Sequence, residues 1–242
     1  MARRIKGLDA DERRAQRRAQ LLDAALELFA AGGYQNTSIE QLCQAAYVGT
    51  KAFYEVFESR EDCYIALLRQ ITEQLSEGMV KVLDQAPDDE RVATPMLVAA
   101  FAHGLVDDPR IARVTFGRGS AVSPDVERQR RLNRRWAASF IESIWRRYGI
   151  VGNAAAGMDV DPHRMAIGVI GGMFDLIADW LLDSDPANPD HLAALITDLT
   201  DFYVTMQTGL RSLAGDAPDD HRVRHHRHAG GQLQPDAGAG RR

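Results

Sequence analysis

The chain has 242 residues, a formal net charge of −5 and a pI of about 5.8. This length leaves room for a second domain beside a small one, and the acidic balance excludes a protein that coats nucleic acid over its whole surface. The two cysteines lack metal-ligand spacing, the N-terminus lacks a signal-peptide core, and no run of 18 apolar residues is present. We therefore expect a cytoplasmic protein with reduced thiols and no membrane span.

Residues 1–16 are predicted to form a basic flexible arm. From residue 3 to residue 18 the chain carries seven arginines or lysines and three acidic residues, a local charge of +4 (seven minus three). Such an arm can neutralise phosphates and make DNA binding sensitive to salt. A solvated leader without a partner is the alternative.

Residues 17–62 are predicted to form three helices separated by short loops. The first carries an apolar stripe at helical spacing and ends at Gly32–Gly33. Thr37 and Glu40 have the spacing of a capping box, which predicts the start of the second helix. A tight turn then leads to a third helix that begins near Gly49.

This stretch resembles the N-terminal DNA-binding domain of the TetR family of bacterial one-component transcription regulators. The resemblance covers residues 17 to about 68. It rests on the run LLDAALELFAAGGYQNTSIEQLCQAA, followed by Val48, Phe53–Tyr54, Phe57 and Ser59–Arg60–Glu61. It implies a helix-turn-helix whose second helix enters the major groove.

The resemblance also implies which residues meet DNA. Base edges would meet the start of the reading helix. The backbone would meet the tyrosine of that helix, the start of the preceding helix and a basic residue that opens the fourth helix. The expected DNA-binding residues are Thr37, Ser38, Val48, Gly49, Thr50, Lys51, Phe53, Tyr54 and Arg60. For Phe53 the alternative is a place in the core. Lys51 could donate to a guanine base or neutralise a phosphate.

Three positions at the DNA-facing tip depart from the family's pattern. Tyr47 stands where the family usually has the turn glycine, Gly49 replaces a frequent serine cap, and Lys51 replaces a frequent glycine. A non-glycine residue at positive φ costs about 1 kcal/mol or more. Either the turn has adjusted its dihedral angles or Tyr47 is strained.

The rest of the chain is predicted to be helical, with no segment of strand periodicity. The expected helices cover residues 60–85, about 95–106, a short stretch after Pro109, 124–148, 162–183 and 189–213. Several begin at a proline, which favours the first helical position. The predicted fold is therefore all-α.

The predicted organisation is an N-terminal three-helix helix-turn-helix DNA-binding domain over residues 17–62, followed by a helical ligand-binding and dimerisation domain over residues 63–213. Residues 214–242 are rich in Gly, Asp and Arg, which is typical of a disordered tail.

The last two helices carry apolar residues on more than one face, which implies burial on more than one side. In the family these helices pair with those of a second copy, so the resemblance implies a homodimer; an internal core of a monomer is the alternative. Gly168, Gly171 and Gly172 would permit close backbone approach. The expected interface residues are Ile170, Met173, Ile177, Trp180, Leu195, Leu199, Phe202 and Met206.

A pocket for an unidentified small-molecule effector is the remaining implication of the resemblance, and its filling would move the fourth helix. The candidate lining residues are Phe101, His103, Phe116, Trp136, Phe140 and Phe174. Each has ordinary core packing as its alternative. The arginines over residues 128–135 are expected to form a solvated face, and the alternative is that one of them meets an anionic ligand group such as a carboxylate or phosphate.

No catalytic constellation is present in the sequence, and we expect neither an enzyme nor a cofactor nor a metal site, since the tail histidines lack tetrahedral spacing. The prediction is a sequence-specific DNA-binding transcriptional regulator, a repressor in most of the family, which a ligand releases from palindromic double-stranded operator DNA. The alternative is a helical ligand-binding or enzymatic protein whose helix-turn-helix is only a packing motif.

Overall fold

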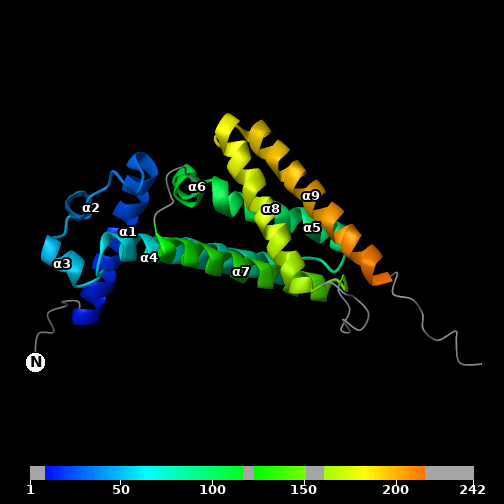
Figure 1. Cartoon of the computed structure of the whole chain (residues 1–242), viewed down its shortest axis with the longest axis horizontal. Coiled ribbons are helices and arrows are strands. Elements are labelled where there is room, and N and C mark those ends of the chain that lie inside the picture. The colour runs from blue at the N-terminus through cyan, green and yellow to red at the C-terminus, as the bar shows by residue number, and fades with distance from the viewer. Residues whose placement is uncertain (1–8, 117–122, 151–160, 216–242) are drawn as a thin grey trace, which may run out of the picture.

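The computed structural model describes residues 9–116, 123–150 and 161–215, and in these ranges the chain forms nine helices and no strand (Figure 1). This confirms the all-α prediction. In chain order the helices are α1 (Ala10–Gly32), α2 (Ile39–Ala45), α3 (Thr50–Tyr54), α4 (Arg60–Gln85), α5 (Glu90–Val106), α6 (Pro109–Phe116), α7 (Pro124–Arg147), α8 (Pro162–Asp183) and α9 (Pro189–Gly215).

Two hydrophobic cores divide the molecule. The first lies among α1, α2, α3 and the first half of α4, and it also takes in Val114 of α6 and Val126 of α7. The second lies among the second half of α4 and α5, α7, α8 and α9. Figure 1 shows α1–α3 at one end and α8 beside α9 toward the other, with α4 leading away from the first group. The helix α4 belongs to both cores and so connects them.

The first helix begins at Ala10, so the prediction of a flexible arm is wrong for residues 10–16. The Asp9 carboxylate accepts a hydrogen bond from the Glu12 N–H at 2.8 Å, and the Glu12 carboxylate accepts the Asp9 N–H at 2.9 Å. This capping box satisfies two N–H groups that a helix start leaves free, and it carries the helix through the arginine-rich segment. Residues 1–8 lie outside the described residues.

The fifth helix begins at Glu90, five residues before the predicted start, and Pro95 lies inside it. Asp89 caps this helix by accepting the N–H of Arg91 at 2.9 Å. A proline removes one helical hydrogen bond, and burial of Ala93 and Thr94 against the second core offsets that loss. The other predicted bounds of the second domain agree to within two residues.

The eighth helix is apolar on most of its surface. Its best 18-residue window has a mean hydropathy of 1.7, with 28% of the window buried. By length and composition alone such a helix can cross a membrane. The expectation of no membrane span stays a prediction. A core helix of a soluble protein passes the same test, which makes the finding weak evidence for a span.

Gly172 of α8 lies close to the Phe202 ring of α9. A Cβ atom at Gly172 would lie 2.5 Å from Cζ of Phe202, far inside van der Waals contact. The bare backbone at Gly172 therefore admits the Phe202 ring, as predicted for a small residue here, but the approach is within one chain.

Candidate functional site

The cap of α2 differs from the predicted one. Ser38 is the N-cap: its hydroxyl accepts the Gln41 N–H at 3.2 Å, and the Gln41 side chain accepts the Ser38 N–H at 2.7 Å. The Thr37 side chain is only 3% exposed and donates to the carbonyl of Gly33 at 3.0 Å. The predictions that Thr37 caps α2 and offers its side chain to DNA are therefore wrong, because this hydroxyl is used inside the first core.

Tyr47 forms the turn between α2 and α3 with a φ of 56°, and within the described ranges it is the one non-glycine residue with positive φ. Its N–H donates to the carbonyl of Gln44 at 3.2 Å. The side chain is 95% exposed. The sequence left open whether the turn adjusts its dihedral angles or Tyr47 is strained, and the structure shows the strained backbone. Because the ring is exposed, its packing does not offset the free-energy cost of the positive φ.

A polar surface lies at the outer ends of α2 and α3, and we call it the reader surface. Its exposed residues are Tyr47, Gly49, Thr50, Lys51 and Tyr54, and Ser38 at its edge is half-buried. Val48 behind it is half-buried. Phe53 is fully buried with its ring centroid 5.7 Å from that of Phe57, so the expectation that Phe53 contacts DNA is wrong and its alternative, a place in the core, is what the structure shows.

Arg60 joins the start of α4 to the loop that precedes α2. Its Nη1 donates to the carbonyl of Thr37 at 2.6 Å, and its guanidinium carbon lies 4.3 Å from the ring centroid of Tyr34. The side chain is half-buried by these contacts. Arg60 thus ties α4 to the segment that leads into the reader surface, and its contact with a phosphate stays a prediction.

Tyr64 connects α4 to α6, α7 and α1. Its hydroxyl donates to the carbonyl of Val114 at 3.1 Å and accepts from Nη2 of Arg130 at 3.3 Å. Its ring meets that of Phe29 edge-on, with centroids 5.1 Å apart. Burial raises the pKa of Tyr64, so the phenol stays protonated and able to donate at neutral pH. No sequence signal points to this role, because an aromatic residue at an apolar helix position indicates only core packing.

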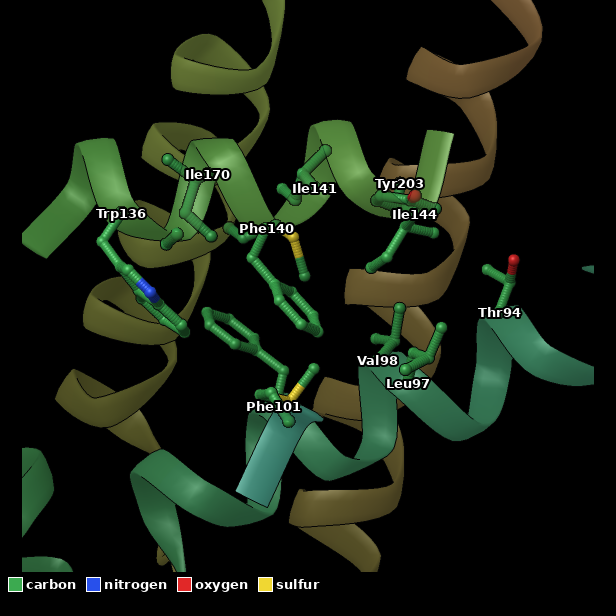
Figure 2. A pocket seen from close by; sticks show the side chains of 13 residues that line it. Thr94, Leu97, Val98, Phe101, Trp136, Phe140, Ile141, Ile144, Ile170 and Tyr203 are labelled. Atoms are coloured by element: carbon green, nitrogen blue, oxygen red, sulfur yellow. The ribbon is translucent and has the colours of Figure 1, made fainter. Parts of the chain in front are cut away.

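An apolar cavity of about 40 Å³ lies in the second core. Phe101, Trp136 and Phe140, all predicted as pocket residues, line it, and Figure 2 shows the rings of Phe101 and Phe140 pointing toward one another. The remaining lining residues are Met79, Thr94, Leu97, Val98, Ala137, Ile141, Ile144, Ile170, Met173 and Tyr203. They come from α4, α5, α7, α8 and α9.

A second cavity of about 70 Å³ lies nearer the first core, and it shares Trp136 and Ala137 with the apolar cavity. The predicted residues Phe116 and Phe174 line it. The ring centroid of Phe174 lies 5.3 Å from that of Phe116 and 5.8 Å from that of Phe101. Phe101 lines the apolar cavity, so the Phe174 ring contacts a residue of that cavity while lining the second.

The prediction that His103 lines the pocket is wrong. His103 is exposed on α5, and its Nδ1 lies 2.8 Å from Oδ1 of Asp107. Two residues along a helix turn a side chain by about 200°, so a residue at 103 faces away from the side on which Phe101 lies. The polar residues that do line the second cavity, among them Thr115 and Arg130, have no apolar periodicity by which the sequence could identify them as lining.

Five of the eight residues predicted for a dimer interface are buried inside the single chain, and the prediction is wrong for them. They are Ile170, Met173, Ile177, Leu195 and Leu199. Their side chains complete the second core, because an apolar helix does not reveal by composition which face meets its own chain. Trp180, Phe202 and Met206 are half-buried.

An outward face of α8 and α9 remains uncovered in the single chain. A Cβ atom at Gly168 or Gly171 would meet no other atom within 4 Å. Leu176 of α8 is 36% exposed and Val204 of α9 is 41% exposed. This face, rather than the buried residues, is the apolar surface available to a second copy.

The two cysteines and the acidic and histidine side chains give no sign of a metal centre in residues 9–116, 123–150 and 161–215. No group of three such side chains is placed to hold an ion there. Cys43 and Cys63 are free thiols in the first core, and burial raises the pKa of Cys63 to about 12. The tail histidines lie outside the described residues.

Comparisons with known proteins agree with this geometry. A family model described as bacterial regulatory proteins, tetR family, matches residues 21–67. The chain is 25% identical over 178 residues to the HTH-type transcriptional activator FasR of Mycolicibacterium smegmatis, covering 73% of this chain and 78% of that protein.

Solved structures share the fold over most of their length. A TetR-family regulator from Syntrophomonas wolfei has a TM-score of 0.65 at 20% identity, over 81% of this chain and 97% of that one. FadR from Bacillus subtilis, in complex with stearoyl-CoA, has a TM-score of 0.59 at 17% identity, over 78% of this chain and 98% of that one.

Proposed function

The chain belongs to the TetR family of bacterial regulatory proteins, and from this premise we propose that it is a homodimeric transcriptional repressor which leaves its operator when a small molecule fills the cavities beside α4. In this proposal the protein binds DNA and a ligand and catalyses no reaction. It acts in the cytoplasm, where operator DNA is found. Residues 17–62 and 63–213 are the two functional domains.

One observation carries the proposal: α4 forms part of the wall of both cavities and part of the core that holds the reader helices. Met79 lines the apolar cavity, while Leu68, Ile71 and Leu75 line the second. Leu68 and Ile71 also belong to the first core. A ligand that enlarges either space pushes on the helix that positions α2 and α3.

The small volumes support such a movement. Cavities of about 40 and 70 Å³ are far below the roughly 300–1,000 Å³ that a drug-sized ligand occupies. Binding therefore separates helices instead of filling a preformed space. A difference of about 1–3 kcal/mol between the two arrangements is enough to change DNA affinity 5- to 150-fold.

The reader surface offers the donors that a DNA backbone and base edges accept. Ser38, Thr50 and Tyr54 supply hydroxyl groups, and Lys51 supplies a cation. We add Tyr47 to the predicted contacts, because its aromatic ring at the tip of the turn is 95% exposed and is not packed against the described residues. Gly49 lets the backbone at the start of α3 approach the groove closely.

Dimerisation through the outward face of α8 and α9 gives two reader surfaces related by a two-fold axis. Gly168 and Gly171 let the partner helix approach, and Leu176 and Val204 would be covered. Two reader surfaces related by a two-fold axis favour a palindromic operator, and the distance between them in the dimer sets the spacing of the half-sites.

The proposal is tested by titrating a selected operator fragment with the full-length protein at several salt concentrations. Operator affinity should fall steeply with salt, and Lys51→Gln should weaken binding and reduce the slope by about one. Lys81→Gln is the matched control, since Lys81 lies exposed in the second half of α4. No DNA affinity at low salt, or equal effects of the two variants, would mean that the helix-turn-helix is only a packing motif.

A further inference from the structure

The second cavity has a polar wall that packing does not explain. Its polar lining residues are Thr72, Thr115, Arg130, Asn133 and Arg134. Oγ1 of Thr115 and Nε of Arg130 are buried and have no hydrogen-bond partner among the described residues. Buried polar atoms are nearly always paired in folded proteins, so two unpaired donors at one cavity indicate a missing acceptor.

The charge of this wall is also unbalanced. Among the described residues no aspartate or glutamate lines the cavity, and none of their carboxylates forms an ion pair with Arg130 or Arg134. By contrast, Arg131 on the outer side of the same helix pairs with Glu127 at 3.0 Å. Residues 117–122, which follow α6, contain no acidic side chain in the sequence. The cavity therefore offers positive charge without its own counterion.

From these two observations, and resting on the proposed function, we infer that the second cavity binds the carboxylate of an effector whose flexible apolar chain runs into the apolar cavity. The guanidinium of Arg130 and the hydroxyl of Thr115 donate to the carboxylate oxygens, and Arg134 adds positive charge beside them. A charge-assisted hydrogen bond of this kind is stronger than one between neutral groups.

The shape of the combined space selects a chain rather than a rigid ring system. Lining residues follow α7 from Arg130 to Ile144, an axial rise of about 21 Å. The two cavities are small, and the Phe174 ring lines the second one in contact with Phe101 of the first. A long and narrow path of this kind fits a chain that bends past one aromatic ring, whereas a coenzyme A nucleotide is far larger than the polar end.

The carboxylate site is joined directly to the reader domain. Arg130 donates to the hydroxyl of Tyr64, which in turn donates to the carbonyl of Val114. Tyr64 packs on Phe29 of α1. An anion that draws the Arg130 guanidinium toward itself thus disturbs the hydrogen bonds that hold α6 and α1 against α4.

The test measures binding of decanoate, dodecanoate and hexadecanoate to the full-length protein by calorimetry at pH 7. The matching alcohols and dodecanoyl-CoA serve as comparison ligands. We expect at least one acid to bind about tenfold or more tighter than its alcohol. Arg130→Gln and Thr115→Val should each remove most of that preference and leave alcohol binding unchanged. Arg131→Gln is the matched control and should bind like the parent protein.

Four results would overturn the inference: no binding of any acid, equal binding of acid and alcohol, tighter binding of dodecanoyl-CoA than of every acid, or equal losses in Arg130→Gln and Arg131→Gln. Thr115→Val keeps the test decisive if Arg130→Gln fails to fold, because valine has nearly the shape of threonine. Operator binding by the ligand-free protein is measured separately, so a failed ligand preference and a failed regulator are told apart.

Discussion

Replacing Tyr47 with glycine should stabilise the protein and weaken its binding to DNA. The φ of 56° places Tyr47 in the left-handed region, which costs an L-residue about 1–2 kcal/mol and costs glycine almost nothing. The exposed ring contributes no burial that the substitution would lose. The backbone hydrogen bond to Gln44 is kept in the variant, because it uses the N–H of residue 47.

Glycine also has more freedom in the unfolded chain, which offsets about 0.5–1 kcal/mol of the gain. The net stabilisation is therefore expected to be about 0.5–1 kcal/mol. For a chain of this size each kcal/mol raises the melting temperature by roughly 2–4 °C, so the rise should be about 1–4 °C.

Thermal unfolding of Tyr47→Gly and Tyr47→Ala separates the effect of backbone strain on stability from the effect of the ring. Alanine removes the ring but keeps a Cβ atom at positive φ, so Tyr47→Ala should melt within about 1 °C of the parent protein. Both variants should bind a selected operator more weakly, because both lack the ring. A melting temperature that falls clearly in Tyr47→Gly would refute the assignment of strain, and undiminished DNA affinity in both would remove Tyr47 from the reader surface.

Further predictions concern the reader surface, the α8 face and the thiols. Tyr54→Phe should lower operator affinity with little change in melting temperature, since only an exposed hydroxyl is lost; unchanged affinity in a titration would remove Tyr54 from the phosphate contacts. Gly168→Leu should convert a dimer to a folded monomer by light scattering. Gly172→Ala should instead destabilise the fold by about 1–3 kcal/mol through contact with Phe202, and the reverse pattern would place the dimer face elsewhere. Cys63, whose pKa burial raises to about 12, should react with a thiol reagent at pH 8 only after unfolding; rapid reaction of the native protein would contradict its burial.

Local signals in the sequence were enough for most of the fold. Proline at the first helical position and glycine or a cap at the ends predicted the bounds of α4, α7 and α8, and the start of α6, to within about two residues, because these signals act within a single turn. The starts of α1 and α5 were missed. In each case a short-range cap by Asp9 or Asp89 extended the helix into a segment that composition marked as a loop.

The candidate site was less predictable, because it depends on which face of a helix meets which neighbour. Five aromatic pocket residues could be proposed from the sequence, yet His103 sits on the opposite face of its helix. Thr37 and Ser38 both fit a capping box by spacing, and only the packing of the first core decides between them. The interface prediction for α8 failed for the same reason. Ile170 and Gly168 lie on one apolar helix, but Ile170 faces the second core and Gly168 faces outward.

Selection of DNA from a random pool with the full-length protein at moderate salt tests the central claim most directly. A dimeric repressor of this architecture should enrich a palindromic sequence with two half-sites at fixed spacing. Enrichment of a single half-site would contradict the dimer, and enrichment of no sequence would contradict a sequence-specific reader.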